Sequence, residues 1–156
     1  MPRLAIVGVG NELRGDDSVG VVVARDLLNT PSVQASETLL VIPAGAAIEN
    51  VTGQLRGFAP DLILIIDAAD MGDAPGAIRL LPADSISGIS AFTHSLPLSM
   101  VMRYLTLELH CQVFLLGIQI RSNEMDIPMC AEVFNAAHEV TDGLCGALGG
   151  EFILSG

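Results

Sequence analysis

The stretch at residues 62–66, Leu-Ile-Leu-Ile-Ile, is the feature that most limits how this chain can fold. Five consecutive branched apolar residues leave a strand with no polar face, so both of its sides must be covered. A parallel sheet with helices on both faces meets that demand, whereas an antiparallel sheet commonly leaves one face in water. Residues 4–9, 38–42 and 112–118 are similar apolar runs, and they predict three further buried strands.

Helical patterns separate these runs. Val19, Val22, Val23 and Leu27 recur at helical spacing, and further helices are predicted over residues 46–56, 95–109 and 129–148. Residues 77–81 alternate weakly and predict an antiparallel edge strand. Strands that alternate with helices indicate an α/β fold. We therefore expect one three-layer domain over residues 1–156, with a mostly parallel, twisted sheet of about five strands and helices on both faces.

The composition and net charge of the chain limit which classes of molecule it is expected to bind. Hydrophobic residues make up 51% of the chain and charged residues 16%, which suits a sheet buried on both sides. The net charge of −11 repels the phosphates of nucleic acid and of anionic membranes, so neither is an expected partner. A basic peptide or a metal cation would be attracted instead.

The cellular compartment is predicted from what the sequence lacks. No apolar run reaches the length that spans a membrane, and no signal peptide is recognisable. The cysteines are Cys111, Cys130 and Cys145, an odd number without a CxxC pair, which indicates small buried side chains in a reducing compartment. We expect a soluble cytoplasmic protein, without membrane insertion, whose most disordered segment is residues 121–126.

Candidate functional residues follow the predicted strands. In open α/β sheets, ligands bind outside the carboxyl ends of the strands. Asp16 and Asp17 follow the first strand, Asp67 and Asp70 follow the third, and His94 precedes the third main helix. Carboxylates and one imidazole are thus predicted to converge at one edge of the sheet.

Asp17, Asp67 and His94 together suit a divalent transition metal, and three protein ligands leave an open coordination position. Each residue also has a purely structural interpretation. Asp17 can cap a helix, Asp67 can cap a turn, and His94 can be a hydrogen-bonded loop histidine. Turn formation is the expected role of Asp70, and neither His110, at a helix end, nor His138, on a solvated helix face, is expected to be a ligand.

Two other classes of site fit the sequence less well. Gly8-x-Gly10 follows a strand, as in dinucleotide-binding folds, but Leu13 occupies the third glycine position and no acidic residue ends the second strand. These glycines indicate a tight turn instead. A serine hydrolase triad is disfavoured because Ser95 adjoins His94 and no G-x-S-x-G motif is present.

Several motifs, in order along the chain, resemble those of the hydrogenase maturation endopeptidases, the proteases that process [NiFe]-hydrogenase large subunits. The resemblance covers essentially the whole chain and is closest to the branch that serves formate-hydrogenlyase-type and related energy-converting hydrogenases. The motifs are Gly8-x-Gly10-Asn11, Gly15-Asp16-Asp17-x-x-Gly20, Leu64-Ile-Ile-Asp67-Ala-Ala-Asp70-Met-Gly72 with Pro75-Gly76, Thr93-His94-Ser-Leu-Pro97-Leu, and Leu116-Gly-Ile-Gln119.

The resemblance implies an activity and a site. Asp17, Asp67 and His94 match the family's metal-binding positions, with Asp17 and Asp67 also as candidate catalytic carboxylates. The family removes a C-terminal extension from the large-subunit precursor after nickel insertion, and the nickel is supplied by the substrate, with other divalent metals as possible substitutes. The resemblance leaves open whether the metal or a carboxylate activates the water. The alternative function is a non-catalytic nickel-binding maturation chaperone, and a second rival is a metal-dependent phosphate-ester hydrolase.

One departure from the family pattern concerns the loop after the second strand. The family usually has an acidic residue there, in Asp-Gly-Gly or Asp-Gly-Thr, whereas this chain has Pro43-Ala44-Gly45. Substrate contacts at that loop therefore do not carry over. Asp16 is expected to cap the following helix or to orient Asp17, and its replacement is expected to reduce activity less than replacement of Asp17.

Overall fold

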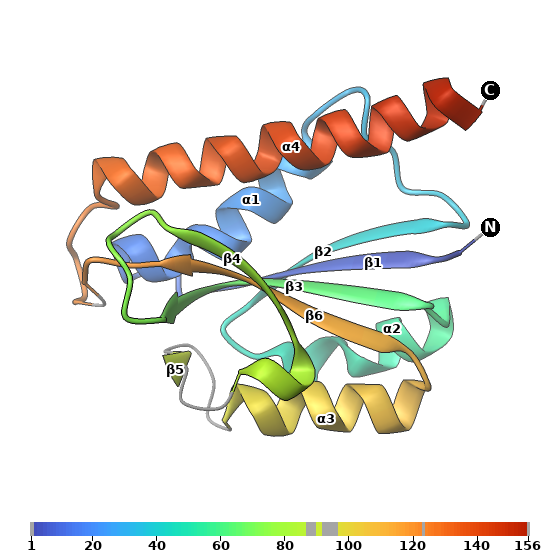
Figure 1. Cartoon of the computed structure of the whole chain (residues 1–156), viewed down its shortest axis with the longest axis horizontal. Helices are drawn as coiled ribbons and strands as arrows, with labels where there is room; N and C mark the ends of the chain where they lie inside the picture. Colours follow the sequence, from blue (N-terminus) through green and yellow to red (C-terminus); the bar gives the residue numbers. More distant parts are fainter. Residues whose placement is uncertain (1, 87–89, 92–96, 123, 156) are drawn as a thin grey trace.

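The computed structural model describes residues 2–86, 90–91, 97–122 and 124–155. These residues form one sheet with the strand order β2-β1-β3-β6-β4, and β5 pairs with the end of β3 (Figure 1). Strands β2, β1, β3 and β6 are parallel, whereas β4 and β5 are antiparallel to their neighbours. The strands are β1 (Leu4–Val9), β2 (Leu39–Gly45), β3 (Leu62–Asp70), β4 (Ile78–Pro82), β5 (Ser90–Ala91) and β6 (Gln112–Gln119).

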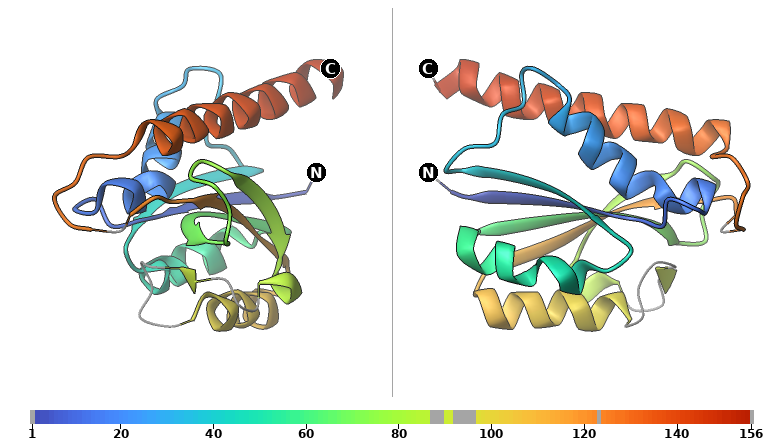
Figure 2. Two further views of the ribbon diagram at one scale, coloured as in Figure 1. Left: turned by 60° about the vertical axis from the view of Figure 1, so that its left-hand side comes forward. Right: turned by 180° about the vertical axis from the view of Figure 1, so that it is seen from behind.

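Helices cover both faces of the sheet, so the predicted α/β class is confirmed. Helices α1 (Val19–Leu28) and α4 (Ala131–Ser155) lie on one face, and α2 (Thr52–Phe58) and α3 (Leu98–Leu109) lie on the other (Figures 1 and 2). Three short 3-10 turns, η1 (Gly15–Ser18), η2 (Ile48–Val51) and η3 (Ala83–Ser85), complete the described elements. No described helix has the length and apolar character needed to cross a membrane.

The two faces of the sheet carry separate cores because side chains alternate along each strand. In β3, Leu64 and Ile66 pack with α1 and α4, whereas Ile63 and Ile65 pack with α2 and α3. The residues at 63, 65 and 66 are fully buried. The apolar run at 62–66 predicted that both faces of this strand are buried. A different pair of helices buries each face.

Two predicted strands are longer than expected. β3 continues past Ile66 to Asp70, so Asp67 lies inside a strand and the interpretation of Asp67 as a turn cap is wrong. β2 continues through Pro43 to Gly45, although proline and glycine usually end strands. Pro43 is tolerated because β2 is the edge strand, where a missing N–H breaks no ladder on the open side.

Helix boundaries also differ from the sequence-based expectations. The element expected at 46–56 is divided into η2 and α2, and α4 runs from Ala131 to Ser155 rather than over 129–148. Pro97 precedes α3 as its N-cap residue rather than lying in its first turn, and Ser95, the expected cap, lies outside the described residues. β4 is an antiparallel edge strand, as predicted.

Gly8 and Gly20 let α1 approach the sheet backbone closely. A Cβ atom on Gly20 would overlap the carbonyl oxygens of Val9 and Ile66, and one on Gly8 would overlap the carbonyl oxygen of Gly20. Gly8 therefore serves close packing rather than the tight turn that the sequence suggested. The contact fixes the start of α1 directly against the ends of β1 and β3.

Candidate functional site

The candidate site lies where the chain changes direction across the sheet. From β1 the chain passes through α1 to β2 on one side, and then through α2 to β3 on the other side of β1. The loops that leave β1 and β3 therefore diverge, and a crevice at such a point is the usual ligand site of an open α/β sheet. In Figure 1 the carboxyl ends of these strands lie at the left, close to the start of α4.

Asp67 lies within β3 and is fully buried. By the alternation of the strand it shares a face with Ile63 and Ile65, the face that α2 and α3 cover. Its partner across the ladder is Gly117 of β6, and the sulfur of Met71 lies over this glycine. The Asp67 carboxylate, which directly follows the apolar run of β3, is thus held in a buried position at the carboxyl end of the sheet.

Asp17 is also fully buried, in the turn η1 between β1 and α1. Its backbone is anchored twice: its N–H donates to the Arg14 carbonyl at 2.7 Å, and its carbonyl accepts from the Asn11 N–H at 3.2 Å. Gly10 lies directly against this carbonyl, where a side chain would not fit. Because η1 also packs against β3, the structure brings Asp17 and Asp67 to the same end of the sheet.

The burial of Asp17 and Asp67 at the same end of the sheet limits what can stabilise their charges. A carboxylate removed from water requires hydrogen-bond donors, a proton or a cation to offset its lost hydration. His94, the third predicted ligand, lies outside the described residues. Within the described ranges, no group of three or more His, Cys, Asp or Glu side chains is arranged to hold a metal ion. The metal-binding roles of Asp17, Asp67 and His94 therefore stay predictions.

Asp16 has a role that the sequence did not reveal. Its carboxylate accepts hydrogen bonds from the backbone N–H groups of Arg121 (2.9 Å), Ser122 (3.3 Å) and Cys130 (2.7 Å), and from the Cys130 thiol (3.4 Å). It does not cap α1, because it is committed to the loop between β6 and α4. The bonds to Arg121 and Ser122 also hold the start of the segment that was expected to be disordered.

The Asp16 contact affects the ionisation of Cys130. Burial raises the pKa of the Cys130 thiol, and the hydrogen bond and negative charge of Asp16 raise it further. The thiol is therefore kept protonated, as its donor role toward Asp16 requires. All three cysteines are free, as expected, although only Cys111 is buried.

Gln119, at the end of β6, organises the loop that follows β3. Its side chain is 5% exposed. Its Oε1 accepts from the N–H groups of Met71 (2.6 Å) and Asp73 (3.3 Å), and its Nε2 donates to Asp70 Oδ1 (3.3 Å). In the sequence Gln119 is recognisable only as part of a motif, because Asp70, Met71 and Asp73 lie more than 45 residues away.

Asp70, His110 and His138 lie in the kinds of local structure that the sequence predicted for them. Asp70 accepts from the Gly72 N–H at 3.2 Å, and Gly72 has a φ of +73°, so Asp70 stabilises a turn. His110 is the C-cap of α3, with a φ of 53°. His138 lies on the exposed side of α4 with its ring edge-on to Phe134, at a centroid distance of 4.6 Å.

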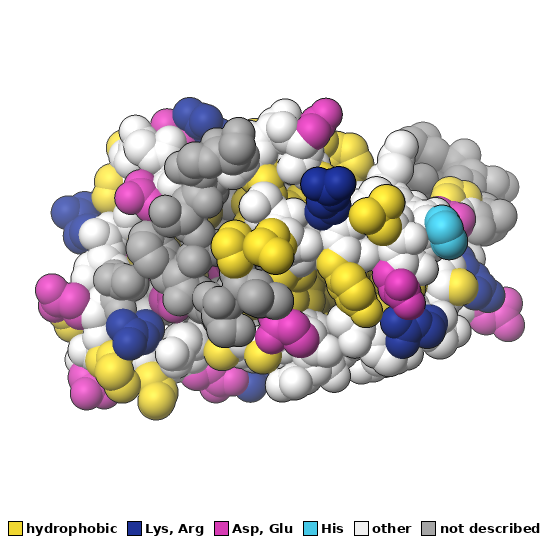
Figure 3. All heavy atoms as spheres, turned by 90° about the horizontal axis from the view of Figure 1, so that it is seen from below, with side chains coloured by type: hydrophobic (Ala, Val, Ile, Leu, Met, Phe, Trp, Pro, Cys, Tyr) yellow, Lys and Arg dark blue, Asp and Glu magenta, His cyan; other side chains and the backbone are white. Residues whose placement is uncertain are grey.

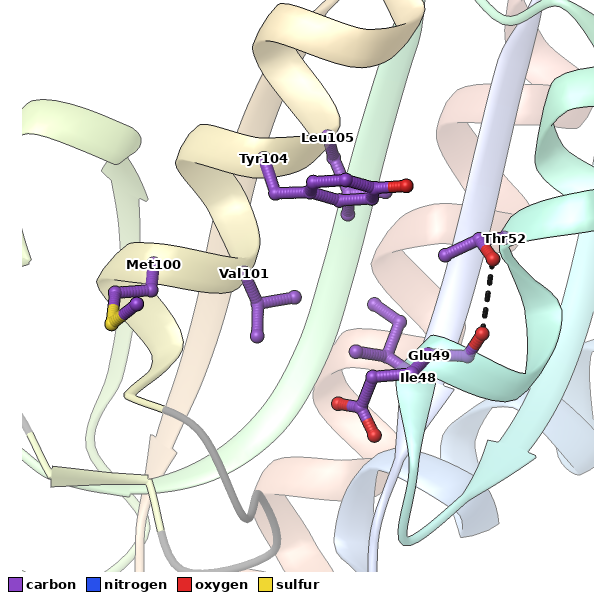
Figure 4. A pocket seen from close by; sticks show the side chains of 7 residues that line it. All are labelled: Ile48, Glu49, Thr52, Met100, Val101, Tyr104 and Leu105. Carbon is purple, nitrogen blue, oxygen red and sulfur yellow. Dashed lines mark hydrogen bonds between the residues drawn. The ribbon is translucent and has the colours of Figure 1, made fainter.

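An apolar groove of about 310 Å³ lies between η2 and α3 (Figure 4). Val101 and Tyr104 of α3 point across it toward Ile48 and Thr52. Figure 3 views the side of the molecule that α2 and α3 cover, and hydrophobic side chains gather over its middle. Glu49 is the acidic residue among those that line the groove, which are Ile48, Glu49, Thr52, Met100, Val101, Tyr104 and Leu105.

A family model and a sequence relative both point to the same family. Residues 23–146 match the family model HycI, described as hydrogenase maturation protease. The Hydrogenase 3 maturation protease of Escherichia coli K12 is 33% identical over 139 residues, which cover 88% of this chain and 86% of that protein.

Structural comparison gives the same family. The crystal structure of the [NiFe] hydrogenase maturation protease HycI from Thermococcus kodakarensis superposes with a TM-score of 0.83 at 27% identity, covering 94% of this chain and 92% of that one. The solution structure of the endopeptidase HycI from E. coli gives a TM-score of 0.76 at 30% identity, covering 93% and 90%.

Proposed function

Because the chain belongs to the family of hydrogenase maturation proteases, we propose that it removes the C-terminal extension of a [NiFe]-hydrogenase large-subunit precursor after nickel insertion. The observation that carries the proposal is the pair of fully buried carboxylates, Asp17 and Asp67, at the switch point between β1 and β3. The precursor is of the formate-hydrogenlyase or energy-converting branch in this proposal, which the Hydrogenase 3 relative supports. The reaction takes place in the cytoplasm.

The substrate's own nickel provides the recognition signal. Asp17, Asp67 and His94 add two oxygen donors and one nitrogen donor, a set that suits nickel and other divalent transition metals. The nickel arrives bound to the precursor, so only a loaded precursor completes the coordination. This makes cleavage conditional on metal insertion.

Cleavage requires a water molecule to attack the scissile carbonyl and to lose a proton. Asp17 and Asp67 supply carboxylates at the site, either of which can accept that proton as a general base. The proton then passes to the nitrogen of the leaving peptide. In this proposal the enzyme is a peptidase that uses aspartate side chains, and the nickel is part of the substrate.

The test is a processing assay read by intact mass. Purified protein is mixed with the nickel-loaded precursor of a candidate hydrogenase and, separately, with the nickel-free precursor. We expect loss of a defined C-terminal peptide from the loaded precursor only. Stable binding without shortening of the precursor would favour the chaperone alternative instead.

Variants assign the roles of the site residues. Asp67→Asn keeps the shape of the side chain but removes its charge, and we expect processing to fall by about 10²-fold or more while the fold is retained. His94→Ala is expected to abolish processing with the same retention of fold. Asp70→Asn, a change at the last residue of β3 that keeps the oxygen acceptor for the following turn, is the matched control and should process normally. A normally active Asp67→Asn variant would contradict the assignment.

A further inference from the structure

Three large apolar side chains are exposed on two neighbouring loops at the carboxyl edge of the sheet. Leu13, in the loop after β1, is 61% exposed, and Met125 and Ile127, in the loop after β6, are 49% and 41% exposed. We call these three residues the rim patch. Exposed apolar side chains that gather at one place commonly mark an interaction surface.

The two loops are held together by backbone contacts. The Asp126 N–H donates to the Leu13 carbonyl at 3.0 Å. Gly15 lies against the Ile127 carbonyl, where a Cβ atom would overlap the oxygen, and it has a φ of +31°. The rim patch is therefore one surface built from segments more than a hundred residues apart in the sequence.

The rim patch is also fixed relative to the candidate site. Asp16 holds the Arg121 and Cys130 ends of the second loop, and Asp16 and Asp17 are consecutive residues of η1. A surface that is already ordered loses little conformational entropy when a partner binds. The buried Asp16 carboxylate thus couples the position of the patch to that of Asp17.

We propose that the rim patch is the docking surface for the folded body of the precursor, an inference that rests on the proposed function. A substrate whose scissile bond reaches Asp17 must cover the neighbouring surface, and the patch lies on the loops that adjoin η1. The chemistry of the partner follows from the flanking charges. In the second loop, exposed Glu124 and Asp126 alternate with Met125 and Ile127, so the partner surface that faces this loop is apolar with a Lys or Arg border.

The experiment measures the dissociation constant of the loaded precursor, with cleavage followed in parallel. The triple variant Leu13→Ser, Met125→Ser and Ile127→Ser is compared with wild type. We expect its binding to weaken by about tenfold or more, as is usual when central apolar contacts are lost. The control is Leu80→Ser on β4, which is 61% exposed like Leu13 and should bind as wild type.

A charge variant tests the border of the patch. Glu124→Gln with Asp126→Asn should slow association and make it less dependent on salt, because steering by these charges is lost. Asn is suitable at 126 because this residue has a φ of 60°.

The outcomes separate the two proposals. Unchanged binding by the triple variant, beside normal cleavage by wild type, overturns the docking surface and leaves the proposed function standing. Binding that is weakened in the triple variant, without cleavage by wild type, supports the surface and removes the peptidase proposal. A wild-type protein that does not bind the precursor overturns the docking surface.

Discussion

At the scale of single residues, the two adjacent aspartates of η1 have different tasks. Asp17 is fully buried at the switch point, whereas Asp16 turns toward the loop before α4 and accepts four hydrogen bonds there. Neighbouring carboxylates in one short turn can serve chemistry and architecture separately, because a 3-10 turn directs consecutive side chains to different sides.

Replacement of Asp16 by alanine should mainly cost stability. The variant leaves the N–H groups of Arg121, Ser122 and Cys130 without their acceptor, and we expect the free energy of unfolding to fall by about 2–3 kcal/mol. Urea denaturation measures this change. Glu12→Ala is the control, because it removes only the exposed ion pair with Arg25 and should change stability by less than about 1 kcal/mol. Equal losses in both variants would contradict the role of Asp16.

The raised pKa of Cys130 predicts its reactivity. A higher pKa leaves less thiolate at any given pH, and the thiolate is the species that reacts with iodoacetamide. The pH midpoint of Cys130 alkylation should therefore lie above that of a free cysteine thiol. Peptide mapping after timed alkylation at several pH values measures the midpoint. A midpoint below that of the free thiol would show that burial and Asp16 do not control this group.

At the scale of elements, the start of α1 is placed by backbone contact, whereas the rest of the helix packs through side chains such as Val23 and Leu27. Gly20 lies against the Val9 and Ile66 carbonyls, so the helix start, η1 and the end of β3 are positioned together. The same contact that shapes the core therefore places Asp17 near Asp67. A helix displaced outward by one side chain would carry η1 away from β3.

Two glycine substitutions should have opposite effects. Gly20→Ala introduces a Cβ atom where two carbonyl oxygens lie, and we expect a destabilisation of about 2 kcal/mol or more. Gly53→Ala, in α2, meets open space and should stabilise the protein by about 0.5–1 kcal/mol through its higher helix propensity. Thermal unfolding of both variants provides the comparison. A stabilised Gly20→Ala variant would refute the backbone contact.

The sequence predicted the strands better than the loops between them. The runs at 4–9 and 62–66 are apolar throughout, so they are recognisable without neighbours, and the carboxyl-end rule then places Asp17 and Asp67 at one edge. The extension of β3 through Asp67 was missed because two carboxylates interrupt the apolar pattern there. The hydrogen-bonding roles of Asp16 and Gln119 were missed for another reason: the partners that define these roles are distant in sequence, and no local pattern encodes such pairs.

At the scale of the whole molecule, the strands of the sheet differ in how strongly they resist local unfolding. β1 and β3 have strands on both sides, and helices cover both of their faces, whereas β4 is an edge strand with two exposed apolar residues, Ile78 and Leu80. Protection from hydrogen exchange follows the stability of the unit that must open. The centre of the sheet should therefore open only with the whole protein.

Hydrogen exchange followed by mass spectrometry tests this distribution. Peptides that cover residues 62–66 should exchange most slowly, and peptides that cover β4 should exchange faster, because β4 can detach from β6 while the other strands stay paired. Equal protection in the two peptides would mean that the sheet opens only as a unit. Faster exchange in residues 62–66 would contradict the fold.

The hydrogen bond from the Cys130 N–H to Asp16 joins residues that are 114 positions apart, so its acceptor is synthesised well before its donor. A ribosome adds about 5–20 residues per second, so roughly 6–23 s pass between the synthesis of the acceptor and that of this donor. During that interval the turn that carries Asp17 has been made but cannot yet be clamped. The rim of the site is therefore completed only after Cys130 has been synthesised, and a nascent chain that stops short of Cys130 cannot offer it to a partner.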